Sequence, residues 1–197
     1  MKEHPILFSG PMVQAILAGQ KTVTRRAVKP SLASQFDEPR GPDDIAAGYP
    51  FVETKAGMSV PAALLCPHGQ PGDRLWVREA WAEINVAQAP GEKWIVYREC
   101  DNRTDYGGPW KPSIHMRRRD SRILLEVTAV RVERLQDINE QQALAEGVML
   151  AERDIDPGGN DLSALELFGG LWVMLNGMES WNSNPWVWVV EFKRVTP

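Results

Sequence analysis

Cysteine is scarce in this chain, and long apolar runs are missing. Only two cysteines occur among 197 residues, Cys66 and Cys100. A chain of this length with 43% hydrophobic residues can close a core without disulfides, so we expect both thiols to be free. No run reaches the roughly 18 apolar residues that a membrane-spanning helix needs. The segment Met1–Pro5 also lacks the apolar core of a secretory signal, which predicts a cytoplasmic protein with no membrane partner.

Several catalytic and cofactor motifs are absent as well. We find no GxxxxGK[ST] loop, no GxGxxG after a strand, no HExxH and no paired CxxC, which disfavours P-loop hydrolysis, dinucleotide redox chemistry and structural zinc. Cys66 and His68, together with His4, His115 or Cys100, offer the side-chain types of a metal site, but their spacing matches no known set of metal ligands. We therefore expect neither a metal nor a cofactor.

The balance of charge restricts the kind of nucleic-acid binding that is open to the protein. The formal net charge is −4, and non-specific coating of nucleic acid requires many cations that displace counterions together. Any such contact must therefore be local. Arg117, Arg118 and Arg119 form one basic cluster, for which two interpretations stand: an arm that binds phosphate, or a solvated loop.

The pattern of apolar residues predicts one α+β domain over residues 1–197. Loop insertions are expected at about 30–70, with a short hairpin near 49–54, and at about 99–120. Strands are expected at 6–8, 21–28, 74–81, 93–98, 122–134 with a bulge, and 186–192 in a central position. Helices are expected from about Pro11 to Gly19, from 137 to 147, and from 162 to 175.

The most concentrated chemical signal lies between Gly19 and Arg26. If the segment leaves a helix and becomes a strand, Thr24 and Arg26 share one face, Val23 and Arg25 share the other, and Lys21 lies at the turn. A hydroxyl between two cations suits an anionic or electron-rich ligand. The alternative is that the cations are solvated and that Thr24 only favours the strand.

The motif Gly19-x-Lys21-x-x-Thr24-x-Arg26 resembles the G-x-K-x-x-T-x-R signature of the ASCH family, a relative of the PUA RNA-binding domain. Three further segments are similar to a bacterial or phage-type subgroup of that family: Gly72–Glu79, Pro112–Met116 and Trp181–Val189. The resemblance implies a PUA-like mixed β-barrel of five to six strands with about three flanking helices. It also implies a cleft between helix and barrel where the signature residues gather.

The resemblance implies RNA or a modified nucleoside as the ligand. It further implies a metal-free hydrolase, either an amidohydrolase of the N4-acetylcytidine type or a ribonuclease, and the alternative is a PUA-like RNA-binding module without catalysis. A third alternative is a phage accessory protein that acts through a partner surface. Nothing in the sequence predicts the oligomeric state.

The same resemblance, extended to the carboxylate that follows the barrel's long turn, implies a catalytic set of Lys21, Thr24 and Glu146. We expect four further residues to bind substrate: Arg26, Arg25, Glu79 and Trp76. Arg26 would clamp an anion or carbonyl, and Trp76 is one of the tryptophans near turns that could stack on a base. For Glu79 the competing interpretation is an ion pair across the sheet with Arg78 or Arg74.

Overall fold

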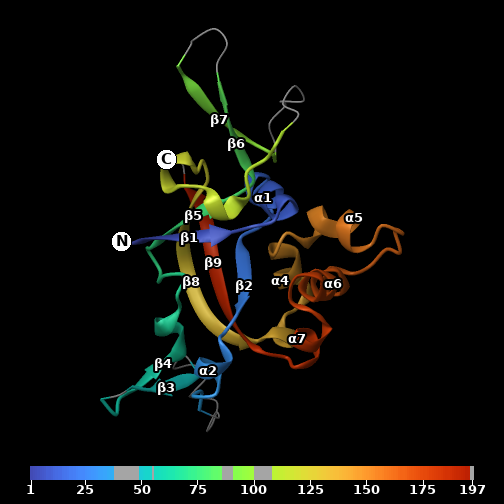
Figure 1. Ribbon diagram of the computed structural model, residues 1–197. Coiled ribbons are helices and arrows are strands. Elements are labelled where there is room, and N and C mark those ends of the chain that lie inside the picture. The colour runs from blue at the N-terminus through green and yellow to red at the C-terminus, as the bar shows by residue number, and fades with distance from the viewer. Residues whose placement is uncertain (38–48, 55, 86–90, 100–107, 196–197) are drawn as a thin grey trace.

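The structure is a computed structural model that describes residues 1–37, 49–54, 56–85, 91–99 and 108–195. Its centre is a curved five-stranded mixed sheet (Figure 1). In spatial order the strands are β1 (Glu3–Leu7), β5 (Arg74–Arg78), β8 (Leu124–Arg134), β9 (Trp186–Val195) and β2 (Val23–Ala27). β1 is parallel to β5, and the other pairs are antiparallel. The predicted α+β class is confirmed.

The two longest strands, β8 and β9, form the middle of the sheet. The predicted bulge in β8 is confirmed as a shift of register between Val127 and Ala129, which allows the strand to bend. β9 pairs with β8 on one side and with β2 on the other, so its predicted central position is also confirmed. Because both of its faces are covered, Val187 to Val190 are all buried.

Helices cover the two faces of the sheet and create two apolar cores. One core joins Val190 of β9 to Val13 and Ile16 of α1 (Gly10–Leu17). The other joins Val187 of β9 to Phe168 of α6. Figure 1 shows the helices of the C-terminal half grouped beside β2. These helices are α4 (Glu140–Ala145), α5 (Glu152–Ile155), α6 (Ala164–Asn176) and α7 (Met178–Asn182). None of the helices in the described residues is long and apolar enough to cross a membrane.

β1 and β2 are the two edges of the sheet. Within the described residues no backbone pairing joins them, so the sheet is open as described. A side chain bridges the gap instead, because the Arg26 guanidinium donates a hydrogen bond to the Leu7 carbonyl at 2.5 Å. We call this gap the seam, bounded by Leu7 and Phe8 on one side and by Thr24 and Arg26 on the other.

The segment 30–70 contains more regular structure than the sequence predicted. The short hairpin expected near residues 49–54 is formed by β3 and β4, a little further along the chain. The elements here are α2 (Pro30–Ala33), β3 (Phe51–Glu53), β4 (Ser59–Pro61) and the 3-10 turn η1 (Ala62–Leu65). The remaining 3-10 turns are η2 (Ser113–His115), η3 (Arg118–Asp120), η4 (Leu135–Asp137) and η5 (Val148–Ala151). The parts of both predicted insertions at 38–48 and 100–107, with Cys100, lie outside the described residues.

The predicted strand at 74–81 is confirmed from Arg74 to Arg78 and is wrong beyond Arg78. β5 ends at Arg78, and Trp81 begins β6 (Trp81–Asn85), which pairs with β7 (Lys93–Tyr97) in a separate hairpin. Figure 1 shows this hairpin projecting from the sheet, at the end opposite to β3 and β4. The chain leaves the sheet at Glu79, whose buried carboxylate is bound by Arg122.

Candidate functional site

The turn between α1 and β2 places Lys21 against the end of α4. The chain reverses at Gly19, which has φ +73°, a conformation that glycine adopts at little cost. The amides of Gln20 and Lys21 then donate to the Ala15 carbonyl at 2.9 and 3.1 Å. The next amide, that of Thr22, donates to the Ala145 carbonyl at 2.9 Å. These backbone bonds fix Lys21 beside the residue that follows Ala145.

That residue is Glu146, and it forms a buried pair with Lys21. The Lys21 Nζ atom lies 2.7 Å from the Glu146 Oε2 atom and 2.8 Å from the Glu146 carbonyl oxygen. Both side chains are almost inaccessible to solvent. The carboxylate position expected from the family resemblance therefore lies in direct contact with the signature lysine, across 125 positions of sequence.

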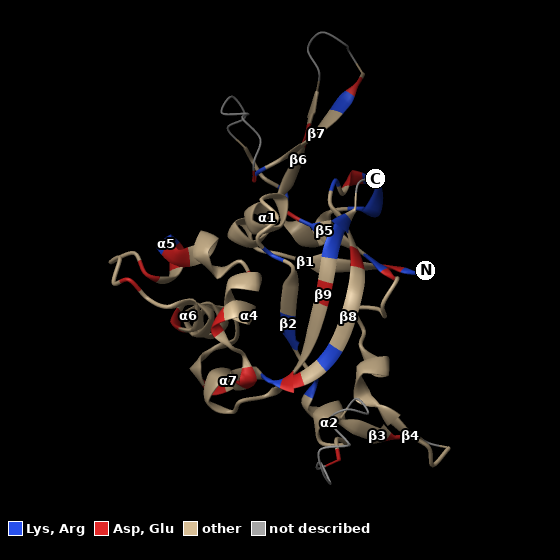
Figure 2. Ribbon diagram, turned by 180° about the vertical axis from the view of Figure 1, so that it is seen from behind, with Lys and Arg blue, Asp and Glu red and all other residues tan. Residues whose placement is uncertain are grey.

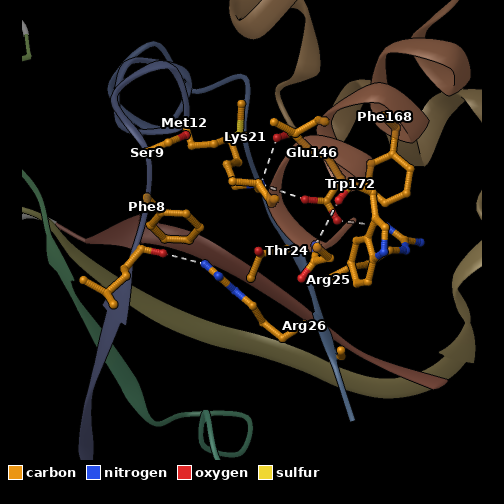
Figure 3. Close-up of a pocket in the computed structure, with 15 residues that line it drawn as sticks. Phe8, Ser9, Met12, Lys21, Thr24, Arg25, Arg26, Glu146, Phe168 and Trp172 are labelled. Carbon is orange, nitrogen blue, oxygen red and sulfur yellow. Dashed lines mark hydrogen bonds and ion pairs between the residues drawn. The ribbon is translucent and has the colours of Figure 1, made fainter. Parts of the chain in front are cut away.

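Thr24 and Arg26 extend the site along β2. They pair with Val190 and Trp188 of β9 and share one face, as predicted, while Arg25 lies on the other face. In Figure 3 Thr24 lies between Lys21 and Arg26. Its side chain is buried, and within the described residues its hydroxyl has no hydrogen-bond partner. The hydroxyl is thus available to a ligand.

These residues line a pocket of about 400 Å³ at the seam, a volume that is typical of small-molecule sites. The polar side chains, from Lys21 to Glu146, are flanked by apolar side chains on both sides, Phe8 and Met12 on one side and Phe168 and Trp172 on the other (Figure 3). The apolar lining consists of Phe8, Met12, Phe168, Leu171, Trp172 and Leu175. Sequence reasoning missed this lining, because helical spacing at 168, 171, 172 and 175 indicates only a buried stripe. No signal in the sequence separates a core stripe from a pocket lining.

Burial changes the acid–base properties of the cations in the pocket. It lowers the pKa of Lys21; Glu146 opposes this by favouring the ammonium form, and Arg26 and Arg25 lower the pKa further. Burial also lowers the pKa of Arg26. Lys21 therefore gives up its proton more readily than a solvated lysine does, which is a requirement for a lysine that acts as a base.

Arg25 was predicted to bind substrate, and the structure gives it other partners. Its side chain has no solvent-exposed surface. The Nη1 atom lies 3.2 Å from the Glu146 Oε1 atom, and the Nη2 atom lies 3.2 Å from Glu133 Oε2 and 3.1 Å from Gln142 Oε1. The guanidinium carbon lies 5.9 Å from the centre of the Phe168 ring. Arg25 thus contributes to the pocket wall while its nitrogen atoms are directed at protein oxygens.

Glu79 and Trp76 do not line this pocket. Glu79 is 1% exposed and forms a two-bond ion pair with Arg122, at 2.9 and 3.0 Å, rather than with Arg78 or Arg74. It borders a second, smaller cavity of about 240 Å³ on the other side of Ser9. Trp76 is buried, and the Arg78 guanidinium lies 4.8 Å from its ring centre.

The basic cluster at 117–119 is paired with carboxylates. Arg117 contacts Asp120 at 2.5 Å, Arg118 contacts Glu3 at 2.6 Å, and Arg119 lies 3.7 Å from Asp120. Figure 2 shows basic and acidic residues close together along β8 and β9 as well. Of the two interpretations of the cluster, the pairing favours the solvated loop, since each exposed arginine already has an acidic neighbour.

The described residues contain no group of three or more histidine, cysteine, aspartate or glutamate side chains that could hold a metal ion. Cys66 is a free, buried thiol, as predicted. Burial raises its pKa to about 11, which disfavours the thiolate form that binds metals and attacks substrates.

Comparison with family models, with curated proteins and with solved structures gave no match. The resemblance to a family therefore rests on the sequence motifs alone.

Proposed function

We propose that this chain is an ASCH-type, PUA-like domain that recognises RNA or a modified nucleoside and hydrolyses it without a metal. In this proposal the curved sheet corresponds to the PUA-like barrel, and the seam is its ligand cleft. One observation carries the proposal: the buried pair of Lys21 and Glu146 lies beside Thr24 and Arg26 in a single pocket. The aromatic side chains that line the same pocket, Phe8, Phe168 and Trp172, suit a planar base.

The arrangement supports amide hydrolysis of the N4-acetylcytidine type. The Thr24 hydroxyl attacks the acetyl carbonyl carbon as neutral Lys21 takes its proton, and Arg26 stabilises the oxyanion that forms. The amine of the base then leaves with the proton from Lys21. Water, deprotonated by Lys21 in the same way, attacks the threonine ester. The Thr24 oxygen leaves with the proton from Lys21, which restores the hydroxyl and releases acetate. Glu146 holds the Lys21 amine in place throughout.

A second candidate, a binding module without catalysis, is supported by a different observation. The Lys21 Nζ atom is hydrogen-bonded to two Glu146 oxygens and not to the Thr24 hydroxyl. With the same residues a ligand would be held through Arg26 and the aromatic side chains of the pocket, and no bond would break. The two candidates differ in what the hydroxyl of Thr24 does.

The test compares Thr24→Val with wild type in the presence of a chelator, on free N4-acetylcytidine and on a mixed pool of single-stranded RNA. We expect wild type to release acetate, and the variant to lose about 100-fold or more in kcat while it retains ligand affinity. Thr128→Val is the matched control, because Thr128 is exposed on β8.

Cleavage of RNA in place of acetate release would identify the ribonuclease version of the proposal. Binding without any product would support the binding module. If wild type neither binds nor cleaves either substrate, both candidates are wrong, and a function that acts through a protein partner becomes the working hypothesis.

A further inference from the structure

Glu146 is shared between two cations, Lys21 from the turn before β2 and Arg25 from β2 itself. Its Oε2 atom accepts from Lys21 at 2.7 Å, and its Oε1 atom accepts from Arg25 at 3.2 Å. Each carboxylate oxygen therefore has its own cation. Since all three side chains are buried, little solvent screens one of them from another.

The pocket contains more positive than negative side chains. Its lining includes three cations, Lys21, Arg25 and Arg26, and one carboxylate, Glu146, with no other titratable side chain. A second carboxylate, Glu133 of β8, contacts Arg25 at 3.2 Å and is also bound by Arg131, which in turn contacts Glu191. With Lys21 protonated these seven side chains carry a net charge of +1, from four positive and three negative groups. Loss of the Lys21 proton would balance them.

We propose that Arg25 is a positioning residue, which competes with Lys21 for Glu146 and thereby sets the pH above which Lys21 acts as a base. This inference rests on the proposed hydrolase function. Glu133 and Gln142 hold the Arg25 guanidinium in this role, because they bind the Nη2 atom and direct Nη1 at Glu146. The arginine that sequence reasoning assigned to substrate thus acts on Lys21 through Glu146.

The direction of the effect follows from the charges. Arg25→Gln removes a nearby positive charge and leaves Glu146 to Lys21 alone, and both changes favour the ammonium form of Lys21. Because the base must be neutral, the acid limb of the kcat/KM profile should move up by about one pH unit. Below the midpoint this corresponds to about a tenfold lower rate.

Two further variants separate this role from a merely structural one. Glu133→Gln removes a negative charge from the far side of Arg25, so the acid limb should move to lower pH, opposite to the effect of Arg25→Gln. Arg25→Lys retains the positive charge and should keep the midpoint close to that of wild type. Damage to packing would lower kcat in all three without moving the midpoints in opposite directions.

The experiment measures Lys21 directly as well as turnover. NMR of isotope-labelled lysine side chains, with the Lys21 signal assigned from its loss in Lys21→Met, follows protonation of Lys21 in wild type and in the three variants. Turnover of N4-acetylcytidine is measured over the same range, from about pH 5 to about pH 10. If Arg25→Gln does not fold, the other two variants still test the proposal. The midpoint of Lys21 protonation should lie at lower pH in Glu133→Gln than in wild type, and close to the wild-type value in Arg25→Lys.

Opposite shifts in the NMR titration support the role of Arg25 even if no variant turns over substrate, in which case the hydrolase proposal alone is wrong. Turnover that depends on Lys21, with the same titration midpoint in all variants, overturns the role of Arg25 and leaves the hydrolase proposal intact.

Discussion

Gly147 is a single residue on which the geometry of the site depends. It follows Glu146 and has φ +76°, in the left-handed region. A Cβ atom at this position would lie 2.6 Å from the Ala15 Cβ atom and 3.0 Å from the Lys21 Cβ atom. Only glycine therefore allows the end of α4 to approach both α1 and Lys21 so closely.

Gly147→Ala should lower the free energy of unfolding by about 2–3 kcal/mol, because strain at positive φ adds to the steric overlap. It should also reduce turnover, since either Lys21 or Glu146 must move. Urea unfolding and kcat measure the two effects. The matched control is Gly57→Ala: Gly57 has φ +75° with no atom within 4 Å of the added Cβ, so it should cost about 1–2 kcal/mol and leave turnover unchanged. If both variants lose equal amounts of stability and of turnover, the steric argument is contradicted.

Some site residues could be predicted from the sequence because their placement depends on local rules. Alternation along β2 correctly places Thr24 and Arg26 on one face. It could not indicate the partners of Arg25, because Glu133 and Gln142 are 108 and 117 positions away. For Glu79 and Trp76 the strand pattern does not reveal which neighbours cover each side chain.

At the scale of elements, α4 and α6 begin in the same way and differ in what their caps contact. Both have a complete capping box, Asn139 with Gln142 in α4 and Ser163 with Glu166 in α6. The Gln142 side chain also accepts a hydrogen bond from Arg25, whereas Glu166 bonds to Ser163. Gln142 therefore both caps α4 and helps to hold Arg25 beside the pocket.

Gln142→Ala and Glu166→Ala form a matched pair. Each should lose about 0.5–1 kcal/mol of stability through the weakened cap. Only Gln142→Ala should also change the catalytic pH profile, since it releases one of the bonds that orient Arg25. Thermal unfolding and kcat/KM against pH measure both. If Glu166→Ala changes the pH profile equally, the effect is on global stability and not on Arg25.

The elements that the sequence predicted best are those with strong internal periodicity and clear ends. The strand at 122–134, the helix at 162–175 and the central closing strand were all found within a few residues. The break after Arg78 was not predicted, since apolar alternation continues to Trp81 while the chain passes into another hairpin. The open edges of the sheet were not predicted either, because they depend on which strands meet in space.

At the scale of the whole molecule, a partly buried histidine links stability to pH. His68 lies in the turn between η1 and β5, and its pKa is lowered to about 4, first by burial and then by the positive charges of Arg26 and His4. It is therefore neutral in the folded protein, while the unfolded chain binds a proton below about pH 6.5. The contribution of neutral His68 to the free energy of unfolding is fully present above pH 6.5 and is lost as the pH falls toward 4.

We expect the free energy of unfolding to fall by about 1–2 kcal/mol between about pH 7.5 and about pH 5 through His68 alone. His68→Gln should remove this part of the pH dependence, and His115→Gln, at an exposed position, is the control. Urea unfolding at the two pH values measures the difference. If the free energy of unfolding of His68→Gln changes with pH as much as that of wild type, other groups are responsible for the pH dependence.

The seam also bears on whether the two edges of the sheet are open to strands of other molecules. Exposed strand edges offer unpaired amides and carbonyls to the strands of other molecules, which is a common route to aggregation. Here the carbonyl of Leu7, in the edge strand β1, accepts a hydrogen bond from Arg26, in the opposite edge strand β2. Both residues line the pocket. A ligand at the seam would cover the same region of both edges. In the function that we propose, ligand recognition and protection against edge-to-edge pairing therefore depend on the same opening in the sheet.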